Sequence, residues 1–202
     1  MRRILHPLPI ALALLAPAVL AQAPGNGSGK PPVTVGVGAV FPTTPYKGVK
    51  TPPATAVPFV NLNLGRFFLQ GVTAGYRLTT HPQASTAAIV QPRFQSYEAS
   101  DSTAFEGMTT RRRTAEGGFR AQLRMGHLQT GLRGVTDLLG RHQGQVMTAN
   151  AGYRLGGPSL AVTPSAGIQW QSGEFVAYYY GVRPGEARGD RPAYNGGAAT
   201  NP

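Results

Sequence analysis

The sequence predicts an all-β protein, an antiparallel transmembrane β-barrel that is incomplete because its closing strands are missing. Several runs of eight to twelve residues alternate apolar side chains with small or polar ones. Arginines recur on the polar face of these runs, as they would inside a water-filled lumen. Beyond the first twenty or so residues, no run is long and apolar enough for a transmembrane helix, so membrane residence would have to come from strands.

Residues 1–21 predict a cleaved signal peptide. Arg2 and Arg3 precede an apolar run over 4–20, and Val19 and Ala21 occupy the two positions before the cleavage site that need small residues. Three prolines and the short length argue against an uncleaved spanning helix. Residues 22–32 are rich in Gly, Ser and Pro and are expected to form a flexible leader. Residues 33–202 are expected to form the partial barrel.

Composition agrees with export and limits the chemistry. The chain has no cysteine, which excludes disulfides and thiolate chemistry, and its hydrophobic share of 41% is too high for a disordered chain. The net charge of +11 predicts an anionic partner. In an exported chain, outer-membrane lipid, lipopolysaccharide phosphates or peptidoglycan-associated polymers are better candidates for that partner than nucleic acid.

The first half predicts strands at 33–41, 57–64, 67–78 and 90–95, with a proline-rich loop over 42–56. Phe68, Val72 and Tyr76 are expected to share one face. Counting 57–64 and 67–78 as separate crossings, with the amino terminus in the periplasm, puts the long loop at 98–113 on the wrong side. Two interpretations stay open here: one long strand bulged at Gly65 and Gly71, or a misassigned crossing.

The second half alternates more regularly. Phe119 and Leu123 oppose Arg120 and Gln122 in the run 114–125, residues 126–127 form a turn, and further strands cover 128–133, 145–155 and 160–171. A soluble antiparallel sandwich would also bury one face of each strand. Arginines on the other face fit a polar lumen better: Arg77, Arg93, Arg120, Arg124, Arg133 and Arg154.

The stretch 175–194 is rich in aromatic residues. Three consecutive tyrosines followed by Gly181 and Pro184 predict a strand end and an aromatic loop rather than an amphipathic helix. The pentapeptide AGYRL occurs at 74–78 and again at 151–155, each time shortly before a turn. This repeat predicts that Tyr76 and Tyr153 lie at the same membrane boundary, the periplasmic one, where turns are short.

Several motifs carry a family resemblance that covers essentially everything after residue 22. They are PYKG at 45–48, VPFVN at 57–61 leading to GRFF at 65–68, FEGM at 105–108, the run 160–171 with YYYGV at 178–182, and PAYN at 192–195. In order and spacing they are similar to the MipA/OmpV family of outer-membrane proteins. The signature positions, interpreted as structural, are Tyr46, Gly48, Pro58, Phe68, Trp170, Tyr179, Tyr180, Gly181 and Tyr194.

The resemblance implies an outer-membrane β-barrel with a scaffold or binding role linked to murein remodelling. Its implied partners are a murein lytic transglycosylase and a murein synthase. Two alternatives stay open: a small pore or uptake channel whose arginine-lined lumen passes anions, and a truncated fragment without a function of its own. Truncation is expected because family members continue through further strands and end in an aromatic-terminated one. In addition, Val49, Lys50 and Thr51 stand where relatives tend to be acidic.

No pattern predicts an enzyme, a cofactor or a metal site. The four histidines are not spaced as ligands of one metal, and no nucleophile elbow surrounds Ser159 or Ser165. The run Arg111, Arg112 and Arg113 could bind lipopolysaccharide phosphates at the barrel rim. A solvated loop run is the alternative interpretation of these three arginines.

Overall fold

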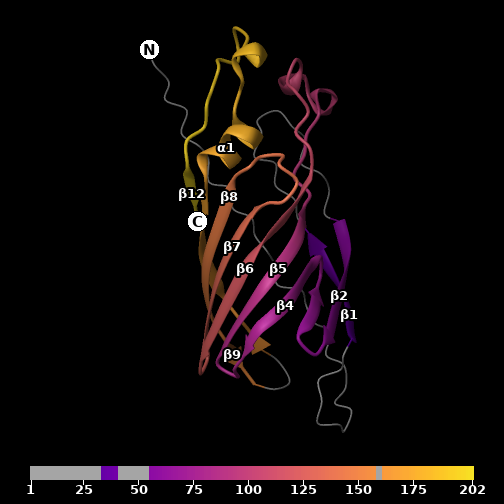
Figure 1. Ribbon diagram of the computed structural model, residues 1–202, viewed down its shortest axis with the longest axis vertical. Helices are drawn as coiled ribbons and strands as arrows, with labels where there is room; N and C mark the ends of the chain where they lie inside the picture. Colours follow the sequence, from indigo (N-terminus) through magenta and orange to yellow (C-terminus); the bar gives the residue numbers. More distant parts are fainter. Residues whose placement is uncertain (1–32, 41–54, 158–160) are drawn as a thin grey trace.

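One antiparallel sheet dominates the computed structural model, which describes residues 33–40, 55–157 and 161–202 (Figure 1). Its ten strands, in spatial order, are β1 (Val33–Val40), β2 (Thr55–Leu64), β3 (Phe67–Gln70), β4 (Thr73–Thr80), β5 (Ala84–Arg93), β6 (Thr114–Met125), β7 (Leu128–Asp137), β8 (Gln145–Tyr153), β11 (Ser165–Gln171) and β12 (Ala199–Asn201). A separate hairpin pairs β9 (Leu155–Gly156) with β10 (Ala161–Val162). The predicted signal peptide and leader lie outside the described residues.

The all-β antiparallel prediction is confirmed. Consecutive strands pair with one another along the whole sheet except where β9 and β10 leave it. In the described residues β1 and β12 are the two edges and do not pair with each other, so the sheet is not closed into a barrel. No helix in the described part of the chain is long and apolar enough to cross a membrane.

The two ends of the sheet differ (Figure 1). At the end that we call the turn end, tight turns at 65–66, 81–83 and 126–127 join the strands. Gly65 and Gly126 adopt φ of 61° and 58°, a left-handed conformation that glycine tolerates best. The opposite loop end carries 94–113 with η1 (Ala99–Asp101) and η2 (Thr103–Phe105), residues 138–144, α1 (Gly173–Tyr180), and 181–198 with η3 (Pro184–Glu186).

The two faces of the sheet follow the predicted alternation. Phe119, Leu132, Met147 and Ile168 are 40–53% exposed on the outer face. Their strand neighbours Arg120 and Arg133 lie half-buried on the inner face, and several of those inner-face side chains bond to one another across strands. The predicted division of β6, β7 and β8 into an apolar and a polar face is therefore correct.

The structure between residues 55 and 80 decides between the two interpretations left open for 57–78. The chain forms three strands there, because turns at Gly65 and Gly71 reverse it twice around the short strand β3. The long bulged strand is therefore the wrong alternative, and a crossing was misassigned. With β3 included, five strands precede the loop 94–113, which places this loop opposite the end at which β1 begins. The predicted face of Phe68 is also wrong: the turn changes the alternation, and Phe68 is buried on the inner face.

Two further predictions are corrected. Residues 173–180 form helix α1 rather than a strand end, because Ser172 caps it by accepting a hydrogen bond from the Phe175 amide. The predicted strand at 160–171 is interrupted at 163–164, between β10 and β11. The Pro164 carbonyl accepts a hydrogen bond from the Tyr153 amide at 3.0 Å, while proline itself has no backbone N–H to donate to a ladder.

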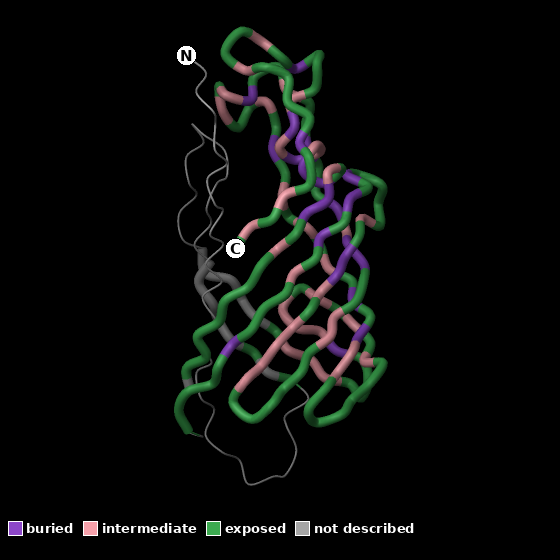
Figure 2. The backbone as a smooth tube through the Cα atoms, turned by 90° about the vertical axis from the view of Figure 1, so that its left-hand side faces the viewer, coloured by how far each residue is buried: buried purple, intermediate pink, exposed green. Residues whose placement is uncertain are grey.

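The hydrophobic core lies toward the loop end, where Figure 2 shows most of the buried residues. Phe175, Val176 and Tyr179 of α1 pack there against Val135 and Val146 of the sheet. Because the helix lies across the ends of the strands, it fills the space beside their inner faces and covers the sheet at this end. The sheet below it has an exposed apolar outer face, and its inner face combines arginines with a few buried apolar residues, among them Phe68 and Ile89.

Candidate functional site

The loop end is built around a buried ion pair between Arg111 and Glu186, which come from two different loops. Two parallel hydrogen bonds join them, from Arg111 Nη1 to Glu186 Oε1 at 3.0 Å and from Nη2 to Oε2 at 2.9 Å. The side chains are 0% and 4% exposed. This fork-to-fork geometry is the strongest form of an arginine–carboxylate contact, and it fixes the relative position of the loops.

Glu186 accepts further hydrogen bonds, from the backbone amides of Thr109 at 2.9 Å and Arg183 at 3.0 Å. Burial of Glu186 opposes ionisation of its carboxyl. The hydrogen bonds from Arg111, Thr109 and Arg183 outweigh that effect and lower its pKa from 4.5 to about 2. The carboxylate is thus fully charged at neutral pH and acts as a fixed acceptor between the two loops.

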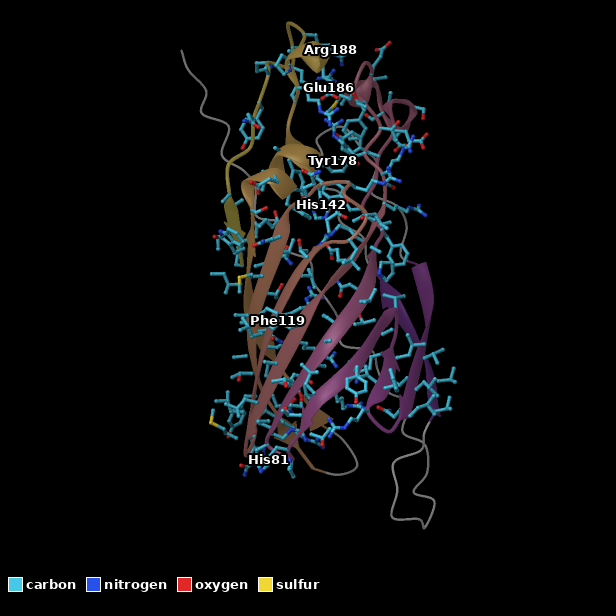
Figure 3. The ribbon with its side chains drawn as sticks, in the orientation of Figure 1. His81, Phe119, His142, Tyr178, Glu186 and Arg188 are labelled. Carbon is cyan, nitrogen blue, oxygen red and sulfur yellow. The ribbon has the colours of Figure 1, made fainter. Side chains whose placement is uncertain are left out.

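Two more arginines tie the same loops together. Arg191 donates to the carbonyls of Ala104 and Glu106 on one loop, at 2.5 and 3.0 Å, and to that of Glu186 on its own. Arg188 donates to the carbonyl of Thr103 at 3.0 Å. Figure 3 shows Glu186 and Arg188 together at the top of the molecule. We call this assembly of 97–113 and 182–195 the cap.

Aromatic side chains connect the cap to the sheet. Arg111 Nε donates to the Tyr178 carbonyl at 2.5 Å, and the Tyr178 hydroxyl accepts from the Arg112 amide at 3.0 Å. Beneath them, the His142 ring lies 5.1 Å from that of Phe175 and 5.6 Å from that of Tyr179. Tyr178 and Tyr179 therefore point in different directions from α1. The helix thus contacts both the cap and the sheet.

A carboxylate at the top of the inner face is surrounded by donors. Glu116, which is 0% exposed, pairs with Arg93 and accepts from Gln91 Nε2 at 3.0 Å. His142 Nε2 lies 3.6 Å from Glu116 Oε1. Nearby, Asp137 fixes the loop 138–144 by accepting from three of its backbone amides. The carboxylates of Glu116 and Asp137 are therefore both engaged in contacts that stabilise the structure.

Lower on the inner face the charge is cationic only. The guanidinium carbons of Arg77 and Arg120 each lie 4.8 Å from the centre of the Phe68 ring. Arg120 donates to Gln70 Oε1 at 2.8 Å, and Arg133, directly opposite Arg120 on the neighbouring strand, donates to Gln91 at 3.2 Å. Within the described residues these arginines bond to neutral partners, so they form a polar layer with a positive charge excess.

A shallow pocket of about 410 Å³ opens beside the carboxyl end of α1. Tyr178, Gly181, Arg183 and Tyr194 are among the residues that line it. Tyr194 is 54% exposed and belongs to a segment joined to Val182 by two backbone hydrogen bonds of 2.8 and 2.9 Å. The exposed aromatic ring of Tyr194 and the exposed guanidinium of Arg183 both line this pocket. Tyrosine and arginine are enriched in binding surfaces.

The structure brings some of the predicted signature residues together and not others. Tyr179, Tyr180, Gly181 and Tyr194 lie in or beside the cap. Phe68 lies on the inner face, and Trp170 is 37% exposed on β11. Pro58 lies in β2, and Tyr46 and Gly48 lie outside the described residues. A structural role for this set as a whole stays a prediction.

The three consecutive arginines Arg111, Arg112 and Arg113 lie in different environments. The prediction that Arg111 is an exposed rim cation is wrong, because its guanidinium is buried against Glu186 and Tyr178. Arg112 and Arg113 are exposed at the loop end. Contact with lipopolysaccharide stays a prediction for these two residues alone.

Sequence patterns did not point to Glu186, His142 or Arg191. Each makes its contacts across gaps of tens of residues or within an irregular loop, where periodicity carries no information. One signal was present: all eight carboxylates lie between positions 98 and 190, although the chain has 202 residues. Such scarcity makes each carboxylate a candidate partner for a buried arginine.

The buried ionisable groups of the cap and of the sheet beneath it are engaged in structural contacts. In the described ranges, no group of three or more His, Asp or Glu side chains could hold a metal ion. Glu116 and Glu186 are each held by arginine, and His142 is enclosed by aromatic rings. The arrangement is suited to holding a shape and presenting a surface.

Comparisons with known proteins identify relatives of this chain. The family model described as MltA-interacting protein MipA matches residues 35–202. The chain is 30% identical to the MltA-interacting protein of Escherichia coli K12 over 190 residues, covering 91% of this chain and 75% of that protein. It is 28% identical to the outer membrane protein Omp26La of Vibrio anguillarum over 102 residues, or 50% of this chain and 40% of that protein.

A third relative, the putative outer membrane protein YiaT of Escherichia coli K12, is 24% identical over 77% of this chain and 64% of its own length. No solved structure matches the chain. The family model covers nearly all of the described residues, and two of the three relatives are named as outer membrane proteins. The chain therefore belongs to the MltA-interacting protein MipA family, a family of outer-membrane proteins.

Proposed function

We propose that this protein is a non-catalytic binding scaffold of the outer membrane whose partner is a murein lytic transglycosylase of the MltA kind. The observation that carries the proposal is the 30% identity to an MltA-interacting protein across 91% of the chain. The structure supports it indirectly, since the charged groups of the cap are engaged in contacts that fix its shape. A scaffold needs such a fixed surface and no reactive centre.

We further propose that the sheet spans the membrane as part of a β-barrel, with the outer face toward lipid. Exposed apolar side chains in the middle of consecutive strands support this, including Phe119, Leu132 and Ile168. Such a face would be costly in water, whereas a polar inner face is what a barrel lumen requires. The short turns then face the periplasm and the cap faces outward.

The scaffold proposal is tested with the full chain purified from outer membranes in a non-ionic detergent. It is presented to the purified lytic transglycosylase of the same bacterium, and binding is followed by biolayer interferometry and by analytical ultracentrifugation. A saturable complex of defined stoichiometry is expected. Absence of a complex at concentrations well above micromolar, with a folded protein by circular dichroism, would overturn the proposal.

A second candidate function is an anion-conducting pore, and the inner-face arginines favour it. Arg77, Arg120 and Arg133 lack a carboxylate partner in the described residues, as a cation-lined path for anions requires. Single-channel recording in planar bilayers tests this candidate. Anion-selective conductance that falls in Arg120→Gln would support it, and a silent bilayer would exclude it.

A further inference from the structure

Charge is distributed unevenly along the long axis of the sheet. Every carboxylate side chain in the sequence belongs to the loop-end half: Glu98, Asp101, Glu106, Glu116, Asp137, Glu174, Glu186 and Asp190. Glu116, the third residue of β6, and Asp137, the last of β7, pair with each other in register at that end of the strands. The turn end therefore has no side-chain carboxylate at all.

The turn end carries exposed cations instead. Arg66, Arg124 and Arg154 are exposed there, together with His81 and His127 (Figure 3 shows His81 at this end). Arg66 donates to the carbonyls of the neighbouring strand, the nearer at 3.1 Å. In the part of the chain that the structure describes, neither a hydrogen bond nor an ion pair engages the side chains of Arg124 and Arg154, so both guanidiniums are available to a partner.

The loop-end carboxylates are too distant to neutralise these cations. Strand β6 has 12 residues, and at about 3.3 Å per residue it separates the two ends by roughly 35–40 Å. The Debye length at physiological salt is about 8 Å, so the two ends act as independent charges. The turn end thus presents an uncompensated positive potential.

Aromatic rings lie next to these cations, on the side toward the middle of the sheet. The Tyr76 ring contacts that of Phe67 edge to face at 4.9 Å, and the Tyr153 ring stacks on that of His127 at 5.7 Å. Rings at this level occupy the membrane–water interface of outer-membrane barrels. The turn arginines lie beyond them, in the aqueous layer that also holds murein and its enzymes.

We infer that the turn end is the docking surface for the partner protein, and that the partner meets it with an acidic face. This inference rests on the proposed scaffold function and adds the surface and the chemistry of its recognition. Exposed arginines around a carboxylate-free end steer an acidic protein to that end and raise its association rate. At the opposite end all eight carboxylates of the chain offset the arginines, so the positive field there is weaker.

The test compares two matched double variants of the full chain, each removing two exposed arginines without side-chain partners in the described residues. Arg124→Gln with Arg154→Gln changes the turn end, and Arg112→Gln with Arg141→Gln changes the loop end. Binding kinetics to the purified lytic transglycosylase are measured at low, physiological and high salt. The turn-end double should bind about five- to tenfold more weakly at low salt, mainly through a slower association rate, and the difference should shrink as salt rises. The loop-end double should stay within about twofold of wild type.

A third variant separates charge from folding. Arg124→Lys with Arg154→Lys keeps both charges and should restore the association rate, with an unchanged circular dichroism spectrum. If the loop-end double weakens binding as much as the turn-end double, or if the turn-end double binds like wild type, the inference is wrong. Loss of binding to phosphatidylglycerol vesicles by the turn-end double, with enzyme binding unchanged, would assign this end to lipid and also overturn it. A wild-type protein that forms no complex overturns the scaffold function itself, an outcome distinct from these.

Discussion

Arg111 and Glu186, 75 residues apart in the sequence, form a buried, doubly hydrogen-bonded ion pair that joins two loops at one end of the sheet. The first loop has only a small apolar contact of its own, the stack of the Phe105 and Tyr97 rings at 4.6 Å, and the second loop is largely irregular. Because the pair is enclosed by protein, each partner depends on the other for its charge to be tolerated. The cap therefore behaves as one unit rather than as two independent loops.

Replacing Arg111 by Gln should destabilise the cap by about 3–5 kcal/mol, because the substitution leaves Glu186 buried without its charged partner. Limited proteolysis should then cleave within 97–113 while the sheet stays intact. Arg112→Gln is the matched control, since the neighbouring side chain is exposed, and it should change stability by no more than about 0.5 kcal/mol. Equal protease resistance of the two variants would contradict a structural role for the pair.

Acid should loosen the cap through Glu186. Its pKa is about 2 in the folded protein, below the ordinary 4.5, so ionisation stabilises the fold above pH 4.5. That contribution should decline as pH falls from about 4.5 toward about 2, because the unfolded chain takes up the proton first. Near-UV circular dichroism of the tyrosines measures the change. Glu186→Gln should be less stable at neutral pH and should lose less stability on acidification than wild type; parallel pH profiles would contradict this assignment.

The alternation in the sequence was sufficient for β6, β7 and β8, but not for the short strand β3 or for the cap. In β6, Phe119 and Arg120 each lie on the predicted face, because strand side chains alternate strictly and the two residues differ in polarity. The repeated AGYRL motif correctly placed Tyr76 and Tyr153 at one end, since β4 and β8 both run toward the turns. Local patterns of this kind are set by neighbours in the sequence.

Helix α1 and the Arg111–Glu186 pair depend on tertiary contacts instead. The helix has only eight residues and consecutive tyrosines, so its intrinsic propensity is low, and packing of Phe175 and Tyr179 on the sheet stabilises it. A local signal did exist, because Ser172 is a favourable cap and Glu174 follows in the first turn. The partner of Arg111 had no local signal, since it lies on another loop.

Outer-face positions should respond to charge according to their depth. Leu132 lies in the middle of β7, whereas Leu123 lies two residues before the end of β6 at the turn end; both are 40% exposed. If this face meets lipid, Leu132→Arg should cost about 2–4 kcal/mol and Leu123→Arg only about 0–1 kcal/mol. Chemical unfolding from lipid vesicles, with heat-modifiable migration on gels as a check of folding, gives both values. Equal costs would mean that the outer face does not cross a bilayer.

Gly75 should tolerate no side chain, because the Phe68 ring lies against it. A Cβ at Gly75 would meet the Phe68 ring, with Cε1 at 2.6 Å, and the Ala88 carbonyl oxygen at 2.8 Å. Phe68 cannot simply move aside, because it is buried and the guanidiniums of Arg77 and Arg120 both lie against its ring. Gly75→Ala should therefore cost about 1–3 kcal/mol through overpacking.

Gly197→Ala is the control for that substitution, since nothing lies within 4 Å of a Cβ built there. It should leave the midpoint of chemical unfolding unchanged or raise it slightly, because the added methyl group meets open space and lowers the conformational entropy of the unfolded chain. A double variant, Gly75→Ala with Phe68→Leu, should recover part of the loss if the ring is the obstacle. If Gly75→Ala alone is as stable as Gly197→Ala, the inner layer around Phe68 is loosely packed and the arginines are not held in place by it.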